Sequence, residues 1–548
     1  MREESERPRG RVFCDAVAKE VEFHTGLEES QSYHNHVMAR YAAVDIGSNS
    51  VRLAVAEVTG GSAPRILASE RQVTRLGLSV FREGRVSAEA LDMLCGVLAN
   101  MSVTWKRHDV LSIRAVATAA VRDARNQVEF LARTSAALGA EIEIISGQEE
   151  ARLIHLGVQS LWPHESERFL IIDIGGGSAE IILSEKDRVC AAFSKPLGAI
   201  RLNELFLRGD PPGAAELLRM DEYIEERIRP AVQEIGRKRI DRVVGTSSTA
   251  AAVVSAVSRI PRARRDEADR RRASVAQMRR LYKELCTLDL RHRQKVVGIG
   301  PRRAEIIIPG AAVLLHVLDA FHMPSLFYSA AGVRDGIIAD LAARGAGREI
   351  SRLTPEQRGM VEGMAEKYGV SLKHAQKVAH LANDLFHDLQ SVHQLPPAMG
   401  RLLEASAYLH DVGHYISDTR HHKHSYYLVA NSDLPGFNLA ERGIIANLCR
   451  YHRKNMPTPE HDNLQALSVE DRRAVTVLTP VLRLADSLDR GNGQRIRSVQ
   501  CSVQEREIVV NLHAPPSAGL ELELWAAARL DGLFRQLFGR KLTIQRAG

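Results

Sequence analysis

The feature that most constrains the fold is an internal repeat. Residues 42–58 read AAVDIGSNSVRLAVAEV, residues 170–185 read LIIDIGGGSAEIILSE, and the aspartates of the two copies, Asp45 and Asp173, stand 128 positions apart. In each copy an apolar strand is followed by Asp-x-Gly, small polar residues and a second strand, which predicts a tight hairpin. Two copies in this order predict two similar halves that face each other across a cleft.

The pattern around the repeat is typical of an α/β fold, because short β-branched strands alternate with amphipathic helices up to about residue 345. Strands are expected at 41–45, 51–58, 113–118, 141–146, 169–174, 179–183 and 242–246, and helices at 87–107, 122–138, 148–161 and 214–236. From about 347 to 500 the strand pattern gives way to helical stretches rich in Leu, Ala and His. The last stretch, 497–548, predicts a small α+β unit with a hairpin, a helix and a final strand.

Composition excludes several classes of protein. A hydrophobic fraction of 45% and a charged fraction of 26% are ordinary for a globular protein, and the net charge of +7 suits an anionic partner without showing one. The six cysteines are scattered without a Cys-x-x-Cys pair, which argues against a disulfide framework and indicates a reducing, cytoplasmic compartment. Only 5% of residues are aromatic and no nucleic-acid module is recognisable, so no nucleic-acid partner is expected.

The N-terminal residues have no apolar core of a signal peptide. We expect residues 1–40 to form a disordered extension, or Met38 to be the true start. No apolar run reaches the roughly 18–20 residues that a membrane span needs, so no integral membrane association is expected.

Three loops of small residues follow predicted strands, at 45–50, 173–178 and 244–250. Backbone N–H groups in such loops can point at an anion, and glycine allows close approach. The candidate phosphate-binding residues are Gly47, Ser48, Asn49, Ser50, Gly175, Gly176, Gly177, Ser178, Gly245, Thr246 and Ser247. Asp45 can hold Mg²⁺ directly or through water, and Asp173 repeats that arrangement.

Two further motifs carry charged residues that suit the same site. Glu149 and Glu150 lie at the start of a predicted helix in SGQEEA, where either carboxylate is also explained as a partner of the helix dipole. Arg122 follows a predicted strand and can grip phosphate, or form a surface salt bridge. A helix N-terminus lowers a carboxylate pKa, so a general base that titrates near neutral pH would need burial to oppose it.

These blocks resemble the exopolyphosphatase/guanosine pentaphosphate phosphohydrolase (Ppx/GppA) family. The matching segments are AAVDIGSNSVRL, VATAAVRDARN, IEIISGQEEARLI, IIDIGGGSAEI, VGTSSTA, RRAEIIIPGA and SAAGVRDG, which follow the family's order from about 41 to 345. The resemblance implies two actin-like ATPase (ribonuclease H-like) halves around a cleft, spanning 41–153 and 154–345. Glu305 departs from the pattern, since members usually have Asp there.

The resemblance also implies an enzyme, a hydrolase that releases phosphate from terminal phosphoanhydrides. Glu150 would be the general base, Arg122 a phosphate clamp, and Asp45 and Asp173 the Mg²⁺ ligands. Family members suggest a homodimer. We expect an exopolyphosphatase acting on inorganic polyphosphate. The alternatives are a guanosine pentaphosphate (pppGpp) 5′-phosphohydrolase, which needs the same cleft, a kinase of the wider superfamily, and a non-catalytic regulator that binds polyphosphate or an alarmone.

Histidines and aspartates in the helical region follow the order of the HD phosphohydrolases, which implies an HD-type domain at 346–496 before the small unit at 497–548. The four matching residues are His374, His410, Asp411 and Asp486, with His424 and His452 as less certain additions. Such donors suit a second divalent metal, Mn²⁺, Fe²⁺ or Mg²⁺. The competing interpretation is a vestigial domain that lengthens a basic channel for the substrate.

One run of charged residues has two competing explanations. The segment 259–272, RIPRARRDEADRRR, is explained either as a solvated surface insertion or as a contact for an anionic polymer.

Overall fold

The computed structural model describes residues 38–59, 64–162, 168–185, 188–236, 238–344 and 351–547. The predicted extension at 1–40 lies outside these ranges except for its last three residues, and Cys14 lies outside them too.

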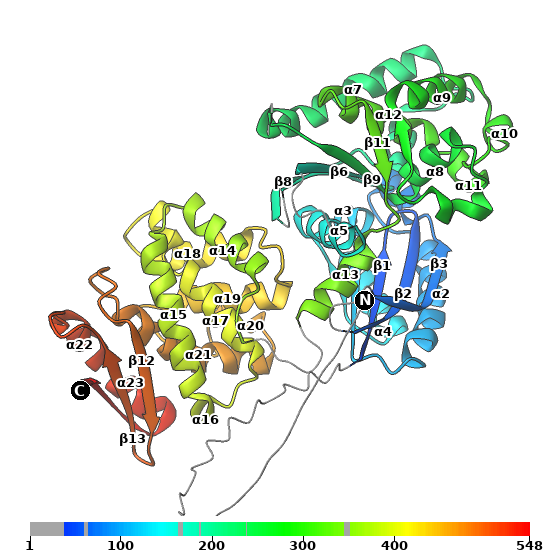
Figure 1. Cartoon of the computed structure of the whole chain (residues 1–548). Helices are drawn as coiled ribbons and strands as arrows, with labels where there is room; N and C mark the ends of the chain where they lie inside the picture. The colour runs from blue at the N-terminus through cyan, green and yellow to red at the C-terminus, as the bar shows by residue number, and fades with distance from the viewer. Residues whose placement is uncertain are drawn as a thin grey trace, which may run out of the picture. The chain divides into compact units, whose positions relative to one another are not determined.

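The first half is built on a five-stranded sheet with the order β3-β2-β1-β4-β5, of which Figure 1 labels β3, β2 and β1. Its strands are β1 (Ala39–Ile46), β2 (Ser50–Val58), β3 (Arg65–Val73), β4 (Ser112–Ala117) and β5 (Ile142–Ile144). Its helices are α1 (Leu76–Glu83), α2 (Ala88–Lys106), α3 (Ala119–Asp123), α4 (Gln127–Leu138) and α5 (Gly147–Leu161). The first three strands form an antiparallel meander, while β4 runs parallel to β1 and β5 parallel to β4.

The second half repeats this plan on a six-stranded sheet with the order β10-β11-β9-β6-β7-β8. Its strands are β6 (Arg168–Ile174), β7 (Ala179–Glu185), β8 (Arg188–Lys195), β9 (Arg242–Thr246), β10 (Arg272–Ser274) and β11 (Ser325–Tyr328). Again an antiparallel hairpin, here β6–β7, is followed by a parallel neighbour, β9. The predicted repeat is therefore present as two hairpins with matching topology.

Nine helices follow the strand β8 in the described part of the chain up to residue 343. They are α6 (Ala199–Phe206), α7 (Ala214–Ile235), α8 (Ser247–Val257), η1 (Arg262–Ala268), α9 (Val275–Thr287), α10 (Leu290–Arg293), α11 (Pro301–Ala304), α12 (Ile307–Ala320) and α13 (Val333–Ala343). Helix α12 buries most of its residues, because its sequence IIPGAAVLLHVLDA is apolar along most of its length. Helix α13 instead packs on the first sheet, where Ile337 and Ile338 join a core with Tyr41, Val116 and Leu153 (Figure 1).

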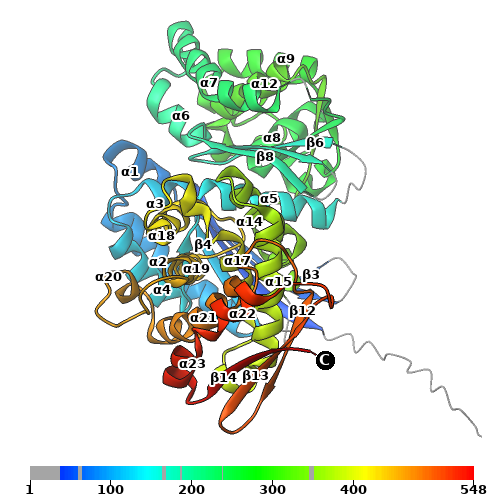
Figure 2. The ribbon, with the colours of Figure 1, turned by 90° about the vertical axis from the view of Figure 1, so that its left-hand side faces the viewer.

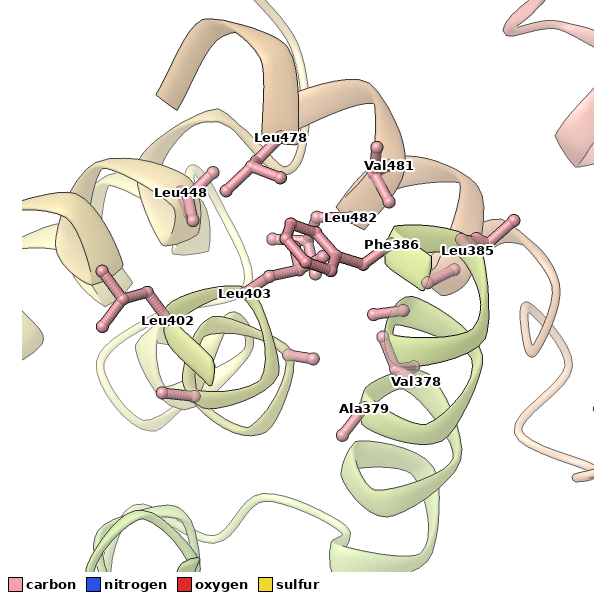
Figure 3. Close-up of a cluster of buried hydrophobic side chains, with 14 of the residues drawn as sticks. Val378, Ala379, Leu385, Phe386, Leu402, Leu403, Leu448, Leu478, Val481 and Leu482 are labelled. Carbon is pink, nitrogen blue, oxygen red and sulfur yellow. The ribbon is translucent and has the colours of Figure 1, made fainter. Parts of the chain in front are cut away.

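The region after residue 350 is helical up to Ser487, as its sequence predicts. Its elements are α14 (Pro355–Lys367), α15 (Leu372–Asp388), α16 (Gln390–His393), α17 (Ala398–Leu409), η2 (Val412–Tyr415), α18 (His421–Asn431), α19 (Leu439–Tyr451), α20 (Asp462–Gln465) and α21 (Val469–Ser487). Leu385 and Phe386 of α15 meet Leu403 of α17 and Leu482 of α21 in a buried cluster (Figure 3).

A three-stranded sheet with the order β12-β13-β14 ends the chain. Its elements are β12 (Ser498–Val503), β13 (Glu507–His513), α22 (Glu521–Ala528), α23 (Asp531–Phe538) and β14 (Lys541–Arg546), so the single predicted helix is two helices (Figure 2). Ile508, Val510 and Phe534 belong to the same apolar core as the preceding helices. The small unit and the helical region therefore share one core.

The strands that the sequence pattern missed are β3, β8, β10 and β11. Strands β3 and β8 both lie at sheet edges. RILASERQV of β3 is largely accessible and lacks the apolar run that marks a buried strand, whereas β8 is half-buried and contains the short apolar run VCAAF. Among the described residues, no helix is long and apolar enough to span a bilayer.

Candidate functional site

The carboxyl ends of the strands in both halves meet around a cavity of about 380 Å³. Both repeated loops line it, and so does the start of α5. Of the predicted residues, those on its wall are Asp45, Gly47, Ser48, Asn49, Ser50, Glu150, Asp173, Gly175, Gly176, Gly177, Ser178 and Ser247. The structure thus brings together residues that the sequence spreads over about two hundred positions.

The two hairpin loops contact each other at this wall. A Cβ on Gly177 would lie 2.7 Å from Ser48 Oγ and 2.7 Å from Phe81 Cζ, and one on Gly176 would lie 3.0 Å from Ser48 Cβ. The second loop therefore needs glycines where the first loop has side chains. Close packing of the loops keeps their backbone N–H groups on the cavity wall.

The third loop departs from the prediction at two of its three residues. Gly245 lies within β9, and a Cβ there would lie 2.8 Å from Leu326 Cδ2, so this glycine serves packing and does not line the cavity. Thr246 donates its hydroxyl hydrogen bond to Asp173 Oδ2 and orients that carboxylate. Ser247 does line the cavity, and its hydroxyl donates to the Ile174 carbonyl at 2.9 Å.

Glu150 is a buried carboxylate in the first turn of α5, on the cavity wall. Burial raises its pKa to about 7, with Arg122 opposing the rise and the negative charges of Asp45 and Asp173 adding to it. Burial likewise raises the pKa of Asp173 to about 6 and that of Asp45 above its usual range. Burial thus outweighs the helix dipole, and Glu150 is suited to accept a proton near neutral pH.

Arg122 lies beside Glu150 and does not line the main cavity. Its Nη1 is 3.3 Å from Glu150 Oε2 and donates to the Ile145 carbonyl at 2.8 Å. It lines a neighbouring cavity of about 280 Å³ with Lys195 and Arg201. The expected clamp on phosphate is therefore, in this structure, an ion-pair partner of the expected base.

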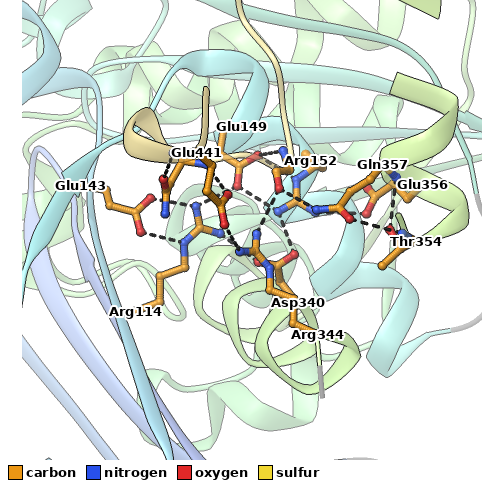
Figure 4. Close-up of polar contacts among 12 residues, drawn as sticks. Arg114, Glu143, Glu149, Arg152, Asp340, Arg344, Thr354, Glu356, Gln357 and Glu441 are labelled. Carbon is orange, nitrogen blue, oxygen red and sulfur yellow. Dashed lines mark hydrogen bonds and ion pairs between the residues drawn. The ribbon is translucent and has the colours of Figure 1, made fainter. Parts of the chain in front are cut away.

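Glu149, the neighbour of Glu150, has the opposite environment (Figure 4). Its Oε1 lies 3.0 Å from Arg114 Nη2, and its Oε2 lies 2.7 Å from Arg152 Nε. Asp340 completes the buried network, at 2.9 Å from Arg152 and 3.0 Å from Arg114. Despite burial, these guanidinium groups lower the pKa of Glu149. The network holds the first turn of α5 and so positions Glu150.

The cations on the cavity wall are not the arginine that the sequence predicted for the site. They are Arg52, Arg71, Arg265, Arg303 and Arg334. Arg52 Nη2 donates to Ser248 Oγ at 2.9 Å, a contact from the first half to the second. Burial and neighbouring arginines lower the pKa of Arg303 to about 9, which is the electrostatic mark of a site built for an anion. Three of the five, Arg52, Arg303 and Arg334, lie in the motifs SNSVRL, RRAE and GVRDG. Their place in these motifs was the feature of the sequence that could have predicted them.

The departure at Glu305 leads to an ion pair. Glu305 Oε2 lies 3.0 Å from Arg75 Nη2, and neither side chain lines the cavity.

A separate cluster in the helical region gathers histidines and aspartates into two groups. One group is His374, His410 and Asp486, and the other is Asp411, His421 and His452, with the ligand atoms of each group within 4.8 Å of one another. The Asp411 carboxylate lies between the groups, since Oδ2 is 3.6 Å from His410 Nε2 and Oδ1 is 3.6 Å from His452 Nε2. His424 belongs to neither group, so the expected position was wrong by one turn of α18.

The imidazoles of this cluster are oriented through their Nδ1 atoms. His410 Nδ1 lies 2.8 Å from the Ala407 carbonyl, His452 Nδ1 2.7 Å from the Cys449 carbonyl, and His421 Nδ1 3.2 Å from the Asp418 carbonyl. A carbonyl only accepts, so each Nδ1 donates and, in the neutral ring, Nε2 carries a lone pair. His374 Nδ1 is 2.8 Å from Asp489 Oδ2, which serves the same purpose.

Comparison with known proteins now decides the family. The model of the Ppx/GppA phosphatase family matches residues 54–344, and the model of Ppx/GppA phosphatase domain III matches residues 357–525. The chain belongs to the Ppx/GppA phosphatase family. It is accordingly a hydrolase that acts on phosphoanhydride bonds, which excludes the kinase alternative.

Relatives cover most of the chain. A curated protein from Photobacterium profundum, named guanosine-5′-triphosphate,3′-diphosphate pyrophosphatase, is 26% identical over 505 residues, which is 91% of this chain and 97% of the relative. An exopolyphosphatase from Cytophaga hutchinsonii is similar in structure, with 25% identity and a TM-score of 0.51 over 56% of this chain and 98% of that one. A second solved structure, of an exopolyphosphatase-like protein, has 26% identity and a TM-score of 0.53 over the same shares.

Proposed function

We propose that the chain hydrolyses the terminal phosphoanhydride of the 5′-triphosphate of guanosine pentaphosphate. The observation that carries the reaction is the buried Glu150 on a wall shared with two carboxylates and five arginines. The curated relative supports this substrate over polyphosphate, because it matches along 91% of the chain, the helical region included. This reverses the order of preference that the sequence suggested.

The chemistry assigned to the chain's own residues is hydrolysis by a single displacement. Glu150 accepts a proton from a water molecule as the water oxygen bonds to the terminal phosphorus. The bond between that phosphorus and the bridging oxygen breaks, which yields inorganic phosphate and guanosine tetraphosphate. Arg52, Arg303 and the loop N–H groups stabilise negative charge on the phosphoryl oxygens.

Asp45 and Asp173 fit Mg²⁺ by the chemistry of their donor set. Both are carboxylates on the cavity wall whose raised pKa values mark uncompensated negative charge in a buried site. Bound there, the ion would neutralise charge on the phosphates.

Inorganic polyphosphate is the second candidate substrate. The neighbouring cavity favours this substrate, because it is lined by the cationic residues Arg122, Lys195 and Arg201. The two cavities adjoin, since Gly177 and Ser178 line both of them. A longer polyanion would use both cavities.

A comparison of the two substrates tests the proposed function. We would measure kcat/KM for phosphate release from guanosine pentaphosphate and from long-chain polyphosphate, each with Mg²⁺. A higher value for guanosine pentaphosphate supports the proposal. A higher value for polyphosphate assigns the second candidate. Binding of both without phosphate release would revive the non-catalytic regulator and contradict the proposed hydrolysis.

We further propose that the histidine cluster is an HD-type site for divalent metal. His410 Nε2 is fully buried and has no hydrogen-bond partner among the described residues. His421 Nε2 and His452 Nε2 face each other at 3.2 Å, although both rings already donate through Nδ1. Two lone pairs at this distance repel unless a cation lies between or beside them. Imidazole and carboxylate donors suit Mn²⁺ or Fe²⁺, two of the ions expected from the sequence.

Metal analysis tests this second proposal without an activity assay. The protein as purified, and after loading with Mn²⁺, should contain transition metal in His424→Ala and lose it in His410→Ala or Asp486→Asn. His424 is the matched control because it lies on the same helix as His421 but in neither group. Equal metal content in all variants would favour the vestigial structural domain.

A further inference from the structure

The arginine-rich segment 259–272 is held against the second sheet. Arg270 N donates to the Tyr328 carbonyl at 2.8 Å, and Tyr328 N donates to the Arg271 carbonyl at 2.9 Å. Ala330 N donates to Asp269 Oδ1 at 2.7 Å. These bonds join the segment to β11 and to the loop that lines the cavity, so it is not a freely solvated insertion.

One arginine of this segment, Arg265, is on the cavity wall. Its Nη2 donates to the Gly298 carbonyl at 3.0 Å, which fixes the guanidinium. Its Nε is buried and has no hydrogen-bond partner within the described ranges. The guanidinium has further N–H donors besides Nε, and because Arg265 lines the cavity, an acceptor that enters the cavity can pair with them. A phosphate oxygen is such an acceptor.

Arg265 shares this part of the wall with Arg71 of β3. The two guanidinium groups repel each other, and Arg52 and Arg262 act on both. Burial and these like charges lower the pKa of Arg71 to about 10. An anion of two or more charges would offset the repulsion.

The cavity wall is ordered across the first sheet. Asp45 of β1, whose charge acts on Glu150, pairs in register with Arg52 of β2, and Arg52 pairs in register with Arg71 of β3, so Arg71 lies one strand farther from Asp45 than Arg52 does. The hydrolysed phosphate must lie beside Glu150. Arg71 and Arg265 are therefore available to a different phosphate of the same substrate.

We propose that Arg265 and Arg71 form a second phosphate subsite, which binds the 3′-diphosphate of guanosine pentaphosphate while the 5′-triphosphate is hydrolysed beside Glu150. The inference rests on the proposed function and deepens it. The same chemistry would bind inner phosphates of a polyphosphate chain, and the test separates the two sources.

The test compares Arg265→Gln with the wild type on guanosine pentaphosphate and on GTP, which has the same 5′-triphosphate but no 3′-diphosphate. Charge-assisted hydrogen bonds of this kind are worth about a 10- to 100-fold change in kcat/KM. We expect a loss of that size for guanosine pentaphosphate, mostly through KM, and less than about a threefold loss for GTP. Equal losses for both substrates, or no loss, would overturn the subsite.

Arg264→Gln is the matched control, because Arg264 is exposed and its Nη2 pairs with Glu267 Oε2 at 2.8 Å. This variant should leave kcat/KM unchanged for both guanosine pentaphosphate and GTP. Absence of phosphate release from guanosine pentaphosphate by the wild type would refute the proposed function. The subsite would then be tested on polyphosphate, where Arg265→Gln should lower kcat/KM for long chains far more than for tripolyphosphate. Equal losses on those two substrates would refute the subsite independently.

Discussion

The two repeated hairpins have the same backbone topology and differ in the residue that pairs with the aspartate. Asp45 of β1 pairs in register with Arg52 of β2, whereas Asp173 of β6 pairs in register with Glu180 of β7. Arg52 lines the cavity and contacts Ser248 of the other half. Glu180 is buried and accepts from Ser194 Oγ at 2.8 Å. One hairpin thus supplies a cation to the site, and the other buries an acid behind it.

This difference shows which part of a repeat is constrained by chemistry. The Asp-x-Gly turn recurs because both halves must place a carboxylate and backbone N–H groups on one wall. The residue that pairs with the aspartate on the second strand, Arg52 or Glu180, is free to differ. Only one half needs a long cationic side chain that reaches the other half.

Among changes to the two hairpins, the largest expected effect comes from breaking what they share. Asp45→Asn and Asp173→Asn should each lower kcat/KM about 10²- to 10³-fold, the usual size for loss of one preorganised electrostatic group. Steady-state kinetics would measure it, with unchanged thermal melting as the control. Because both carboxylates suit one cation, the double variant should be little worse than either single one. Losses that multiply would contradict a shared ion.

The next effect comes from the difference between the loops. Gly177→Ala should lower the free energy of unfolding by about 1–3 kcal/mol, because the added methyl overlaps Phe81 and Ser48. The matching residue of the first loop is Asn49, and Asn49→Ala should cost less than about 1 kcal/mol. Urea unfolding gives both values. Equal costs would show that the loops do not interlock as described.

A pH profile sharpens the comparison further. Glu150 must be ionised to accept a proton, and its pKa is about 7, so kcat/KM should fall about tenfold per pH unit below that value. Asp173→Asn removes a negative charge that disfavours ionisation, which lowers the pKa of Glu150 and moves the acid limb to lower pH. A limb that stays in place, or moves upward, would contradict the coupling.

The smallest effect is expected at Glu180. Burial, together with the charges of Glu150 and Asp173, raises its pKa well above the usual range, which favours the neutral carboxyl. Glu180→Gln keeps a neutral group of the same shape and should change the free energy of unfolding by less than about 1 kcal/mol. Denaturant titration at pH 7 measures this. A cost of several kcal/mol would mean that Glu180 is ionised in the folded protein.

The sequence predicted those parts of the site that depend on short, continuous motifs. The turns at Gly47 and Gly175, the two aspartates and Glu150 are each encoded within six residues of a strand end, where local pattern is informative. Gly245 was assigned wrongly because the same small-residue pattern serves close packing against Leu326.

Residues brought together by topology were not predictable. Arg71 lies on an edge strand without an apolar pattern, and Arg265 lies in a charge run that solvent exposure explains equally well. In the run RHHKH, the choice between His421 and His424 depends on where α18 begins, and only the fold sets that residue. His421 and His424 share one face of α18 one turn apart, so the position along the helix, rather than composition, decides which histidine reaches Asp411.

The most direct test of Glu150 as the general base is phosphate release by Glu150→Gln with guanosine pentaphosphate and Mg²⁺. We predict a fall in kcat of about 10²- to 10⁴-fold, the usual contribution of a general base, with little change in KM and in thermal stability. A kcat within about threefold of the wild type would contradict Glu150 as the base and would move the search for the hydrolytic centre away from the cavity between the hairpins.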